Sequence, residues 1–145
     1  MILGSISLLL YKWQSIFANK KTLNNKTPKT IIPAHIIALN ELSKLEKAKI
    51  WQEGNAKEYH SQLSEIIRRY SEHRFKVIAL ELTTDEILDE LKSILNTKQV
   101  SNLRILLQRA DLAKFAKSKP IDTENQESMV LAKQFVNSTK TKKNE

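Results

Sequence analysis

The sequence contains no cysteine, and only two of its 145 residues are glycine and three are proline. Without cysteine the chain can form no disulfide bond, no thiolate nucleophile and no cysteine-based zinc site. So few glycines and prolines disfavour a β-sandwich, which needs many turns, and favour long helices. With only Gly4 and Gly54, a glycine-rich phosphate-binding loop is excluded as well. The length suits a single domain with a sizeable core.

Acidic residues are absent from the first 40 residues, which carry five lysines. Residues 140–145 contain three lysines and one glutamate, whereas residues 41–139 hold 16 basic and 15 acidic residues. The formal net charge of +8 therefore belongs mainly to the two ends of the chain. A globular nucleic-acid-binding domain carries its positive field on the folded part, so we expect no specific nucleic acid as a partner.

The chain opens with MILGSISLLLYKW, in which eleven residues precede the first charge, Lys12. This apolar run is shorter than the ~20 residues that cross a bilayer, and its charges follow it, the reverse of a signal peptide. Lysines directly after an apolar segment mark the cytoplasmic side of a membrane helix and are attracted to anionic lipids. We therefore expect residues 1–17 to form a partial transmembrane or interfacial helix and residues 18–32 a basic linker; a frayed basic N-terminus is the alternative. The expected anchor residues are Ile2, Leu3, Ile6, Leu8, Leu9, Leu10 and Trp13.

Residues 33–138 show apolar residues at helical spacing, and they predict an all-α domain of five antiparallel helices. The first two helices are expected at 33–53 and 55–73, with Gly54 as the stop signal and Asn55 as the N-cap. Their apolar stripes are Ala38, Leu42, Leu45 and Ala48 in the first helix, and Tyr59, Leu63, Ile66, Ile67 and Tyr70 in the second.

Residues 75–82 are apolar and partly β-branched, but a lone strand would have no partner, so an irregular connection packed on the core is expected. Thr83 and Glu86 have the spacing of a capping box at the start of the third helix, and Thr123 with Gln126 repeats it before the fifth. The last two helices are expected at 99–117 and 123–137, and residues 139–145 as a disordered tail. The stripes of these three helices are Ile87, Leu88, Leu91, Ile94 and Leu95; Val100, Leu103, Leu106, Leu107 and Ala110; and Met129, Ala132 and Val136, with Leu131 and Phe135 beside them.

No motif with catalytic spacing is present, so we expect no enzyme activity, no cofactor and no small-molecule substrate. The three histidines, His35, His60 and His73, are not spaced as metal ligands, and exposed or capping roles are favoured for them. A cation site on the acidic group Asp85, Glu86, Asp89 and Glu90 is conceivable. Acids in the first turns of a helix more simply complement its dipole, so no metal site is expected.

Three arginines, Arg68, Arg69 and Arg74, lie near the end of the second helix, where cations suit the helix dipole. They could bind the carboxylates of a partner, or Arg68 and Arg74 could form an internal pair with Glu81 or Asp85. Under the first interpretation, the expected partner surface consists of Arg68, Arg69, Arg74, Asp85 and Glu86.

The third and fourth helices, joined by a short turn, allow a second interpretation as a soluble helix-turn-helix regulator. Its recognition helix would present Asn102, Arg104, Gln108 and Arg109 to the bases. The preceding helix carries four acids and the fold is nearly neutral, which opposes the phosphate attraction that supplies most non-specific affinity.

Residues 38–88 and 106–136 resemble the cytosolic domain of membrane proteins encoded in Bat (aerotolerance) operons. Such operons also encode a MoxR-type AAA+ ATPase and proteins with von Willebrand factor A domains. The resemblance covers about residues 33–138. The matching residues are Trp51, Gly54, Lys57, Glu58, Tyr59, Arg68, Tyr70, Arg74, Phe75, Glu81, Thr83, Thr84, Asp85, Glu86, Asp111, Lys114, Phe115, Ala116, Lys117, Pro120, Ala132, Phe135 and Val136.

The resemblance transfers no catalytic residue and implies an architecture instead. It implies an extracytoplasmic N-terminal part, one membrane helix, a basic stop and a helical domain on the cytosolic side of the inner membrane. The apolar start of this chain resembles the C-terminal half of such a membrane helix. We therefore expect a non-enzymatic, membrane-tethered interaction domain whose protein partners belong to a MoxR and von Willebrand factor A system for envelope or stress tolerance.

Overall fold

The computed structural model describes residues 30–142, and within them the chain forms five α-helices and no β-strand. They are α2 (Ala34–Lys47), α3 (Ala56–Phe75), α4 (Thr84–Leu91), α5 (Thr97–Phe115) and α6 (Asp122–Thr139). All belong to the compact unit that begins at Ile32. The predicted anchor at 1–17, most of the predicted linker and the last three residues lie outside the described residues. Among the helices that are described, none is both long and apolar enough to cross a bilayer.

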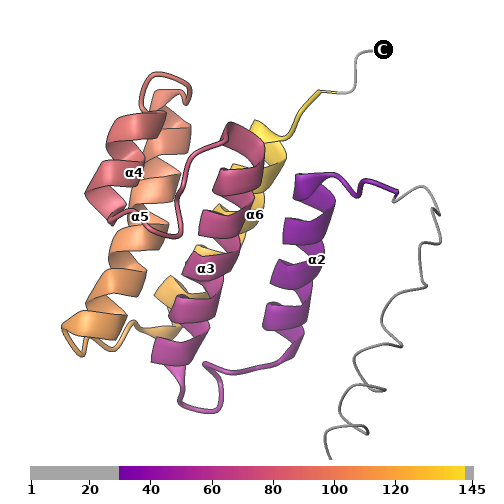
Figure 1. The fold of residues 1–145 in the computed structure, drawn as a ribbon. Coiled ribbons are helices and arrows are strands. Elements are labelled where there is room, and N and C mark those ends of the chain that lie inside the picture. The colour runs from indigo at the N-terminus through magenta and orange to yellow at the C-terminus, as the bar shows by residue number, and fades with distance from the viewer. Residues whose placement is uncertain (1–29, 143–145) are drawn as a thin grey trace, which may run out of the picture. The chain divides into compact units, whose positions relative to one another are not determined.

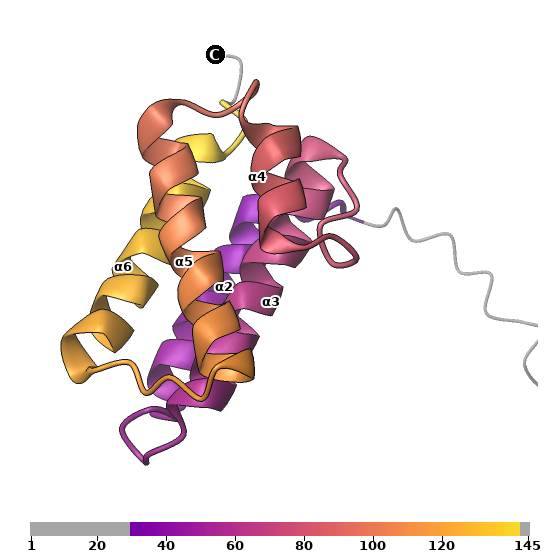
Figure 2. The same ribbon diagram turned by 90° about the vertical axis from the view of Figure 1, so that its left-hand side faces the viewer.

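The four long helices form an antiparallel bundle (Figures 1 and 2). Around the ring α2 packs on α3, α3 on α5, α5 on α6 and α6 on α2, and α3 also contacts α6 across the centre. The short helix α4 packs on α5, outside the ring. The predicted all-α fold is thus confirmed for residues 30–142.

The core collects the predicted apolar stripes. Fully buried side chains come from every helix, among them Leu42, Leu63, Ile87, Leu107 and Phe135. Two predictions about the stripes are wrong. Ile94 is 58% exposed because α4 ends at Leu91 and the following turn directs Ile94 outward, and Ala48 is exposed beyond the end of α2.

The first helix ends at Lys47, six residues before the predicted stop. Residues 48–54 form successive turns, with Lys49 and Gly54 at positive φ. The bend lets Ile50 and Trp51 pack on the core, where the Trp51 ring lies edge-on to Tyr59 at 6.5 Å. A straight continuation of α2 would carry both apolar side chains away from the core, so burial overrides the helical pattern.

Of the three helix caps that the sequence predicts, two are confirmed. Asn55 accepts from the Glu58 N–H as predicted, and Thr83 with Glu86 forms the complete capping box. Asn96 and Gln99 form a further box that the sequence analysis missed. The box predicted from Thr123 to Gln126 is wrong, because α6 starts at Asp122 and its N-cap is Ile121, two residues before Thr123.

At the start of α6 the Glu124 carboxylate accepts from the N–H of Ile121, whose own side chain has no acceptor. The helix then runs to Thr139, two residues further than predicted. Thr139 is buried, and its hydroxyl shares a hydrogen bond of 2.9 Å with the Tyr70 hydroxyl. Thr139 therefore belongs to the bundle and not to the predicted disordered tail.

We expect Leu107→Ala to lower the free energy of unfolding by about 2–5 kcal/mol, because Leu107 is fully buried and its loss leaves a cavity. Leu112→Ala, on the same helix but 54% exposed, serves as the matched control and should change it by less than about 0.5 kcal/mol. Urea denaturation measures both. Equal losses for the two variants would show that α5 does not present this face to the core.

Candidate functional site

An open groove of about 600 Å³ lies between α3 and α5, beside the connection that leads from α3 to α4. The α3 side contributes Ser61, Ser64, Glu65 and Arg68, and the α5 side contributes Ala110, Asp111, Lys114 and Phe115. The connection and the start of α4 complete the lining with residues 80–84. A hollow that combines apolar and polar side chains in this way is the usual form of a binding site.

Arg68 forms part of the lining of the groove and ties it together. Its guanidinium donates to the carbonyls of Ala79 (3.0 Å) and Leu82, and also reaches the hydroxyls of Ser64 and Thr84 (both 3.3 Å). Burial lowers the pKa of Arg68, and the negative charge of Asp111 opposes that shift. Four of the five N–H donors are used inside the domain, so Arg68 fixes the wall of the groove more than it offers charge to a ligand.

Thr84, at the start of α4, and Asp111, on α5, also line the groove and contact each other. The Thr84 hydroxyl donates to one carboxylate oxygen of Asp111 at 2.5 Å. Within residues 30–142, the second carboxylate oxygen of Asp111 accepts no hydrogen bond. Because Asp111 is half-buried in the groove, that oxygen can accept a hydrogen bond from an incoming donor.

The rim of the groove carries large apolar side chains that face solvent. Phe115 is 74% exposed and Leu80 is 45% exposed. The Lys114 ammonium lies 5.2 Å from the centre of the Phe115 ring, a cation–π distance. The rim therefore combines an exposed aromatic ring with charges of both signs, since Glu81 is exposed as well.

The five residues predicted as a partner surface do not form one surface. Arg68 faces the groove, whereas Arg69 faces α2, where it pairs with Glu41 at 2.9 Å. Arg69 also pairs with Glu65 on its own helix at 2.5 Å. The neighbouring positions 68 and 69 point to different sides of α3 because consecutive residues on a helix are about 100° apart.

The other three predicted partner residues are also placed by local contacts. Arg74 donates to the carbonyl of Thr139 at 2.6 Å and lies 5.1 Å from the centre of the Phe75 ring. Glu86 caps α4, which lowers its pKa through the hydrogen bonds with Thr83, and Asp85 is exposed. The predicted internal pairs of Arg68 or Arg74 with Glu81 or Asp85 are not formed, because both arginines bond to backbone carbonyls instead.

The residues proposed for a DNA-recognition helix are not all accessible. Arg109 donates to the Glu124 carbonyl (2.9 Å), the Ser128 hydroxyl (2.7 Å) and the Glu127 carboxylate (2.9 Å). Asn102 is half-buried, while Arg104 and Gln108 are exposed. Because the Arg109 guanidinium holds α6 against α5, it is not free to pair with a base.

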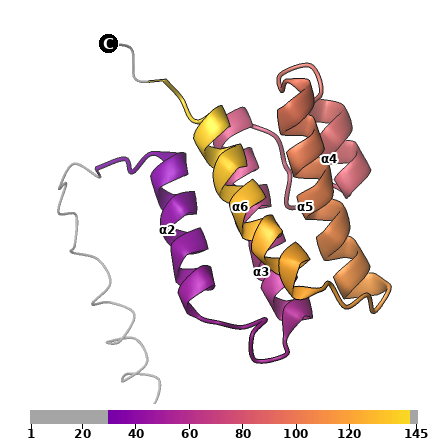
Figure 3. The same ribbon diagram turned by 180° about the vertical axis from the view of Figure 1, so that it is seen from behind.

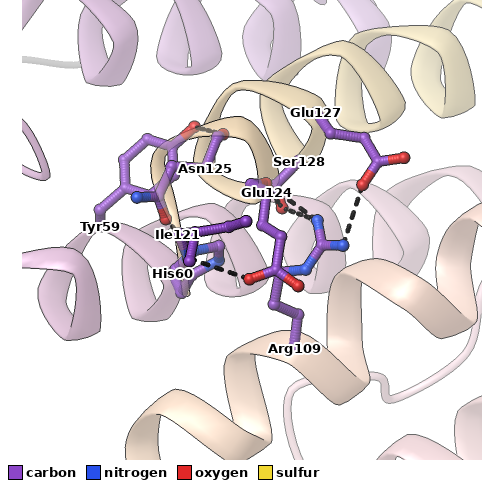
Figure 4. A network of polar contacts seen from close by, with 8 residues as sticks. All are labelled: Tyr59, His60, Arg109, Ile121, Glu124, Asn125, Glu127 and Ser128. Carbon is purple, nitrogen blue, oxygen red and sulfur yellow. Dashed lines mark hydrogen bonds and ion pairs between the residues drawn. The ribbon is translucent and has the colours of Figure 1, made fainter. Parts of the chain in front are cut away.

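A second polar cluster is buried where α3 meets α6 (Figure 4). The Tyr59 hydroxyl donates to the Asn125 carbonyl at 2.9 Å, and burial, aided by Glu46, raises the pKa of Tyr59 to about 12. His60 Nε2 lies 2.7 Å from the side-chain oxygen of Asn125, so this nitrogen is the donor. Arg109 lies beside them and holds the first turns of α6 (Figure 4).

His60 is fully buried, and its Nδ1 has no partner among the described residues. Burial lowers the pKa of His60, and the nearby positive charge of Arg109 lowers it further, against the opposing effects of Asn125 and Glu124. A proton on Nδ1 would place an unsolvated charge in the core, so His60 stays neutral in the folded state at neutral pH. The predicted exposed or capping role of the histidines is therefore wrong for His60.

Sequence reasoning missed the groove because contacts distant in the sequence form it. Thr84 and Asp111 are 27 residues apart, and Arg68 reaches carbonyls 11 and 14 residues further along the chain. The sequence signals for the groove were Arg68, which was assigned to another surface, and a polar residue, Asp111, directly after the buried stripe of α5. Within residues 30–142, no group of three or more His, Asp or Glu side chains is arranged to hold a metal ion.

No protein-family model, curated protein or solved structure matches this chain.

We expect Arg68→Lys to lower the free energy of unfolding by about 1–3 kcal/mol, because one ammonium cannot replace the fork that serves two carbonyls and two hydroxyls. Arg69→Lys, which alters a half-exposed ion pair, should cost less than about 1 kcal/mol. Urea denaturation measures both variants. A cost for Arg69→Lys as large as that for Arg68→Lys would contradict the bridging role of Arg68.

His60 predicts a pH dependence of stability. Its pKa is lowered on folding, so the unfolded chain takes up the proton first as the pH falls below about 6.5. The free energy of unfolding should therefore fall between about pH 6.5 and the lower pKa of the folded state. His60→Gln keeps a donor for Asn125 and should flatten this slope, whereas His73→Gln, at an exposed position, should leave it. A slope that survives in His60→Gln would assign it to other groups.

Proposed function

We propose that this chain is a non-enzymatic, membrane-tethered interaction protein whose helical domain holds a protein partner in the groove between α3 and α5. The observation that carries the proposal is the exposed Phe115 ring in the lining of that groove, together with the exposed Leu80. Large apolar side chains that face solvent beside a hollow are typical of protein interaction sites, and aromatic residues supply much of the affinity there.

The chemistry of the groove supports a particular kind of ligand. An apolar side chain of the partner would cover Phe115 and Leu80, and a lysine or arginine next to it would meet the free oxygen of Asp111. The volume of about 600 Å³ lies within the range of about 300–1,000 Å³ that is usual for binding pockets. The groove is open along one side, which suits a segment of a protein more than an enclosed small molecule.

The tether and the identity of the partner come from the sequence. Three features support a location of the helical domain at the cytosolic face of the inner membrane. They are the apolar start, the five lysines that follow its first eleven residues and the resemblance to proteins of Bat operons. The same resemblance suggests a MoxR-type ATPase or a von Willebrand factor A protein as the partner. The alternative of a DNA-binding regulator has less support, because Arg109 is bound to α6.

A photo-crosslinking amino acid at position 115 tests the groove in the full-length protein. We expect cross-links from position 115 to a MoxR-type ATPase or a von Willebrand factor A protein, identified by mass spectrometry from membranes of the native host. Position 112 is the matched control, because Leu112 is exposed on the same helix but does not line the groove. Equal cross-linking at both positions would contradict the groove as the site.

A second variant separates binding from folding. Phe115→Asp should abolish capture of the cross-linked partner by the tagged protein, while Leu112→Asp should retain it. Both positions are exposed, so the midpoint of urea unfolding should change little in either variant. If capture survives in Phe115→Asp, the partner binds elsewhere on the molecule.

A further inference from the structure

Four segments of the chain meet at one end of the bundle, where Ile32 leads into α2 (Figures 1 and 3). They are residues 32–37, 73–77, 92–98 and 138–142. We name this the entry end. It comprises the start of α2, the end of α3, the turn between α4 and α5, and the end of α6.

Side-chain contacts hold these segments together. The Gln99 amide donates to the carbonyl of Ser138 at 3.1 Å, which joins the start of α5 to the end of α6. Arg74 donates to the carbonyl of Thr139, which joins the end of α3 to the same place. The start of α2 shares a small hollow with the end of α3. The entry end is therefore one continuous surface and not a set of separate chain ends.

Cations are concentrated on the entry end. Its four segments contain six basic residues and no aspartate or glutamate, whereas the rest of residues 32–142 contains 12 basic and 15 acidic residues. The nearest acids, Glu72, Asp89 and Glu90, lie one to three residues before these segments. Glu72 accepts from the N–H of Leu80, and Asp89 pairs with Lys92. The six basic residues are Arg74, Lys76, Lys92, Lys98, Lys140 and Lys142.

Isoleucines that face solvent accompany these cations. Ile32, Ile36, Ile37 and Ile94 have exposed fractions from 40% to 58%. Three of them flank the first turn of α2, and Ile94 projects from the turn between α4 and α5. Apolar side chains that are exposed to water are not stabilised by burial. Next to lysines, they can be buried at the boundary between the headgroups and the acyl chains of a bilayer.

We infer that the entry end lies directly on an anionic lipid bilayer, with its lysines at the headgroups and its isoleucines at the acyl boundary. Basic residues next to a membrane gain from the negative surface potential of anionic lipids. The 29 residues that precede the described region add five lysines and no acid, and they are joined to the domain at this end. The inference rests on the proposed tether. It adds that the domain contacts the membrane in one fixed orientation.

The absence of cysteine allows a direct test in the full-length chain. Ser93→Cys places a single thiol beside Ile94 at the entry end, and Ser118→Cys places one after α5 at the opposite end; both serines are exposed. Each variant is labelled with an environment-sensitive fluorophore and mixed with vesicles of phosphatidylcholine alone or with phosphatidylglycerol. We expect a shift to shorter emission wavelength only at position 93, and only with phosphatidylglycerol.

Charge reversal tests the electrostatic part of the inference. In the Ser93→Cys background, reversal of Lys98, Lys140 and Lys142 to glutamate should abolish the shift. Reversal of Lys57, Lys117 and Lys119, which are equally exposed near the opposite end, should preserve it. Salt at 1 M, where the screening length is about 3 Å, should also suppress the shift at position 93.

The outcomes separate the tether from the orientation. Co-sedimentation with the same vesicles measures binding of the whole chain. If the chain sediments with neither kind of vesicle, the proposed tether is contradicted. A chain that sediments but shows the same emission at positions 93 and 118 contradicts the oriented contact alone. A shift at position 93 that is equal with phosphatidylcholine alone would refute the role of the lysines. A shift produced by duplex DNA without vesicles, and not by phosphatidylglycerol, would assign the surface to nucleic acid instead.

Discussion

The arrangement of this domain depends on one half-buried guanidinium, that of Arg68. The connection between α3 and α4 has no helical hydrogen bonds of its own, yet it packs Ala79 and Leu82 against the core. Carbonyls that are withdrawn from water need donors. Arg68 supplies them from the facing side of α3, and the same group reaches Thr84 at the first turn of α4. The position of α4, the Thr84–Asp111 contact and hence the shape of the groove all follow from where α3 places this side chain.

Other polar side chains of α3 hold α6 in place. Near the start of α3, Tyr59 and His60 bond to Asn125 at the beginning of α6, and near its end Tyr70 and Arg74 bond to Thr139 at the end of α6. These contacts fix the register of α6 along α3 at two points about four turns apart. Apolar packing alone tolerates small shifts between helices, whereas directional bonds at both ends do not. The buried polar groups thus define one arrangement of the bundle, although each adds little to stability.

The sequence predicts features that depend on local periodicity, such as helices, but not contacts between residues that are distant in the chain. Helical spacing located all five helices, and Asn55 and Thr83 located two of their starts, because these signals lie within one or two turns of the chain. Ile94 continued the period of α4 but is exposed, since no local signal reports that a helix ends after two turns. The arginine cluster misled for a related reason. Because Arg68 and Arg69 are adjacent in the sequence, they were predicted to share one surface. In the structure Arg68 bonds to the connection between α3 and α4, and Arg69 pairs with Glu41 on α2. The sequence alone does not show where α2 and the connection lie.

The two proposed surfaces constrain each other through the direction of α5. This helix starts at the entry end and carries the groove residues Asp111, Lys114 and Phe115 in its last two turns. At 1.5 Å per residue, the 18 residues from Lys98 to Phe115 separate the two by about 25 Å. A bilayer at the entry end would therefore leave Phe115 beyond the headgroup region, which occupies only about 5–8 Å on each side of the hydrocarbon core. A domain that lay on the membrane by the flank that carries the groove would instead cover Phe115 and Asp111. Lipid contact at the entry end therefore leaves the groove open to a partner, so the two proposed surfaces can be occupied at the same time.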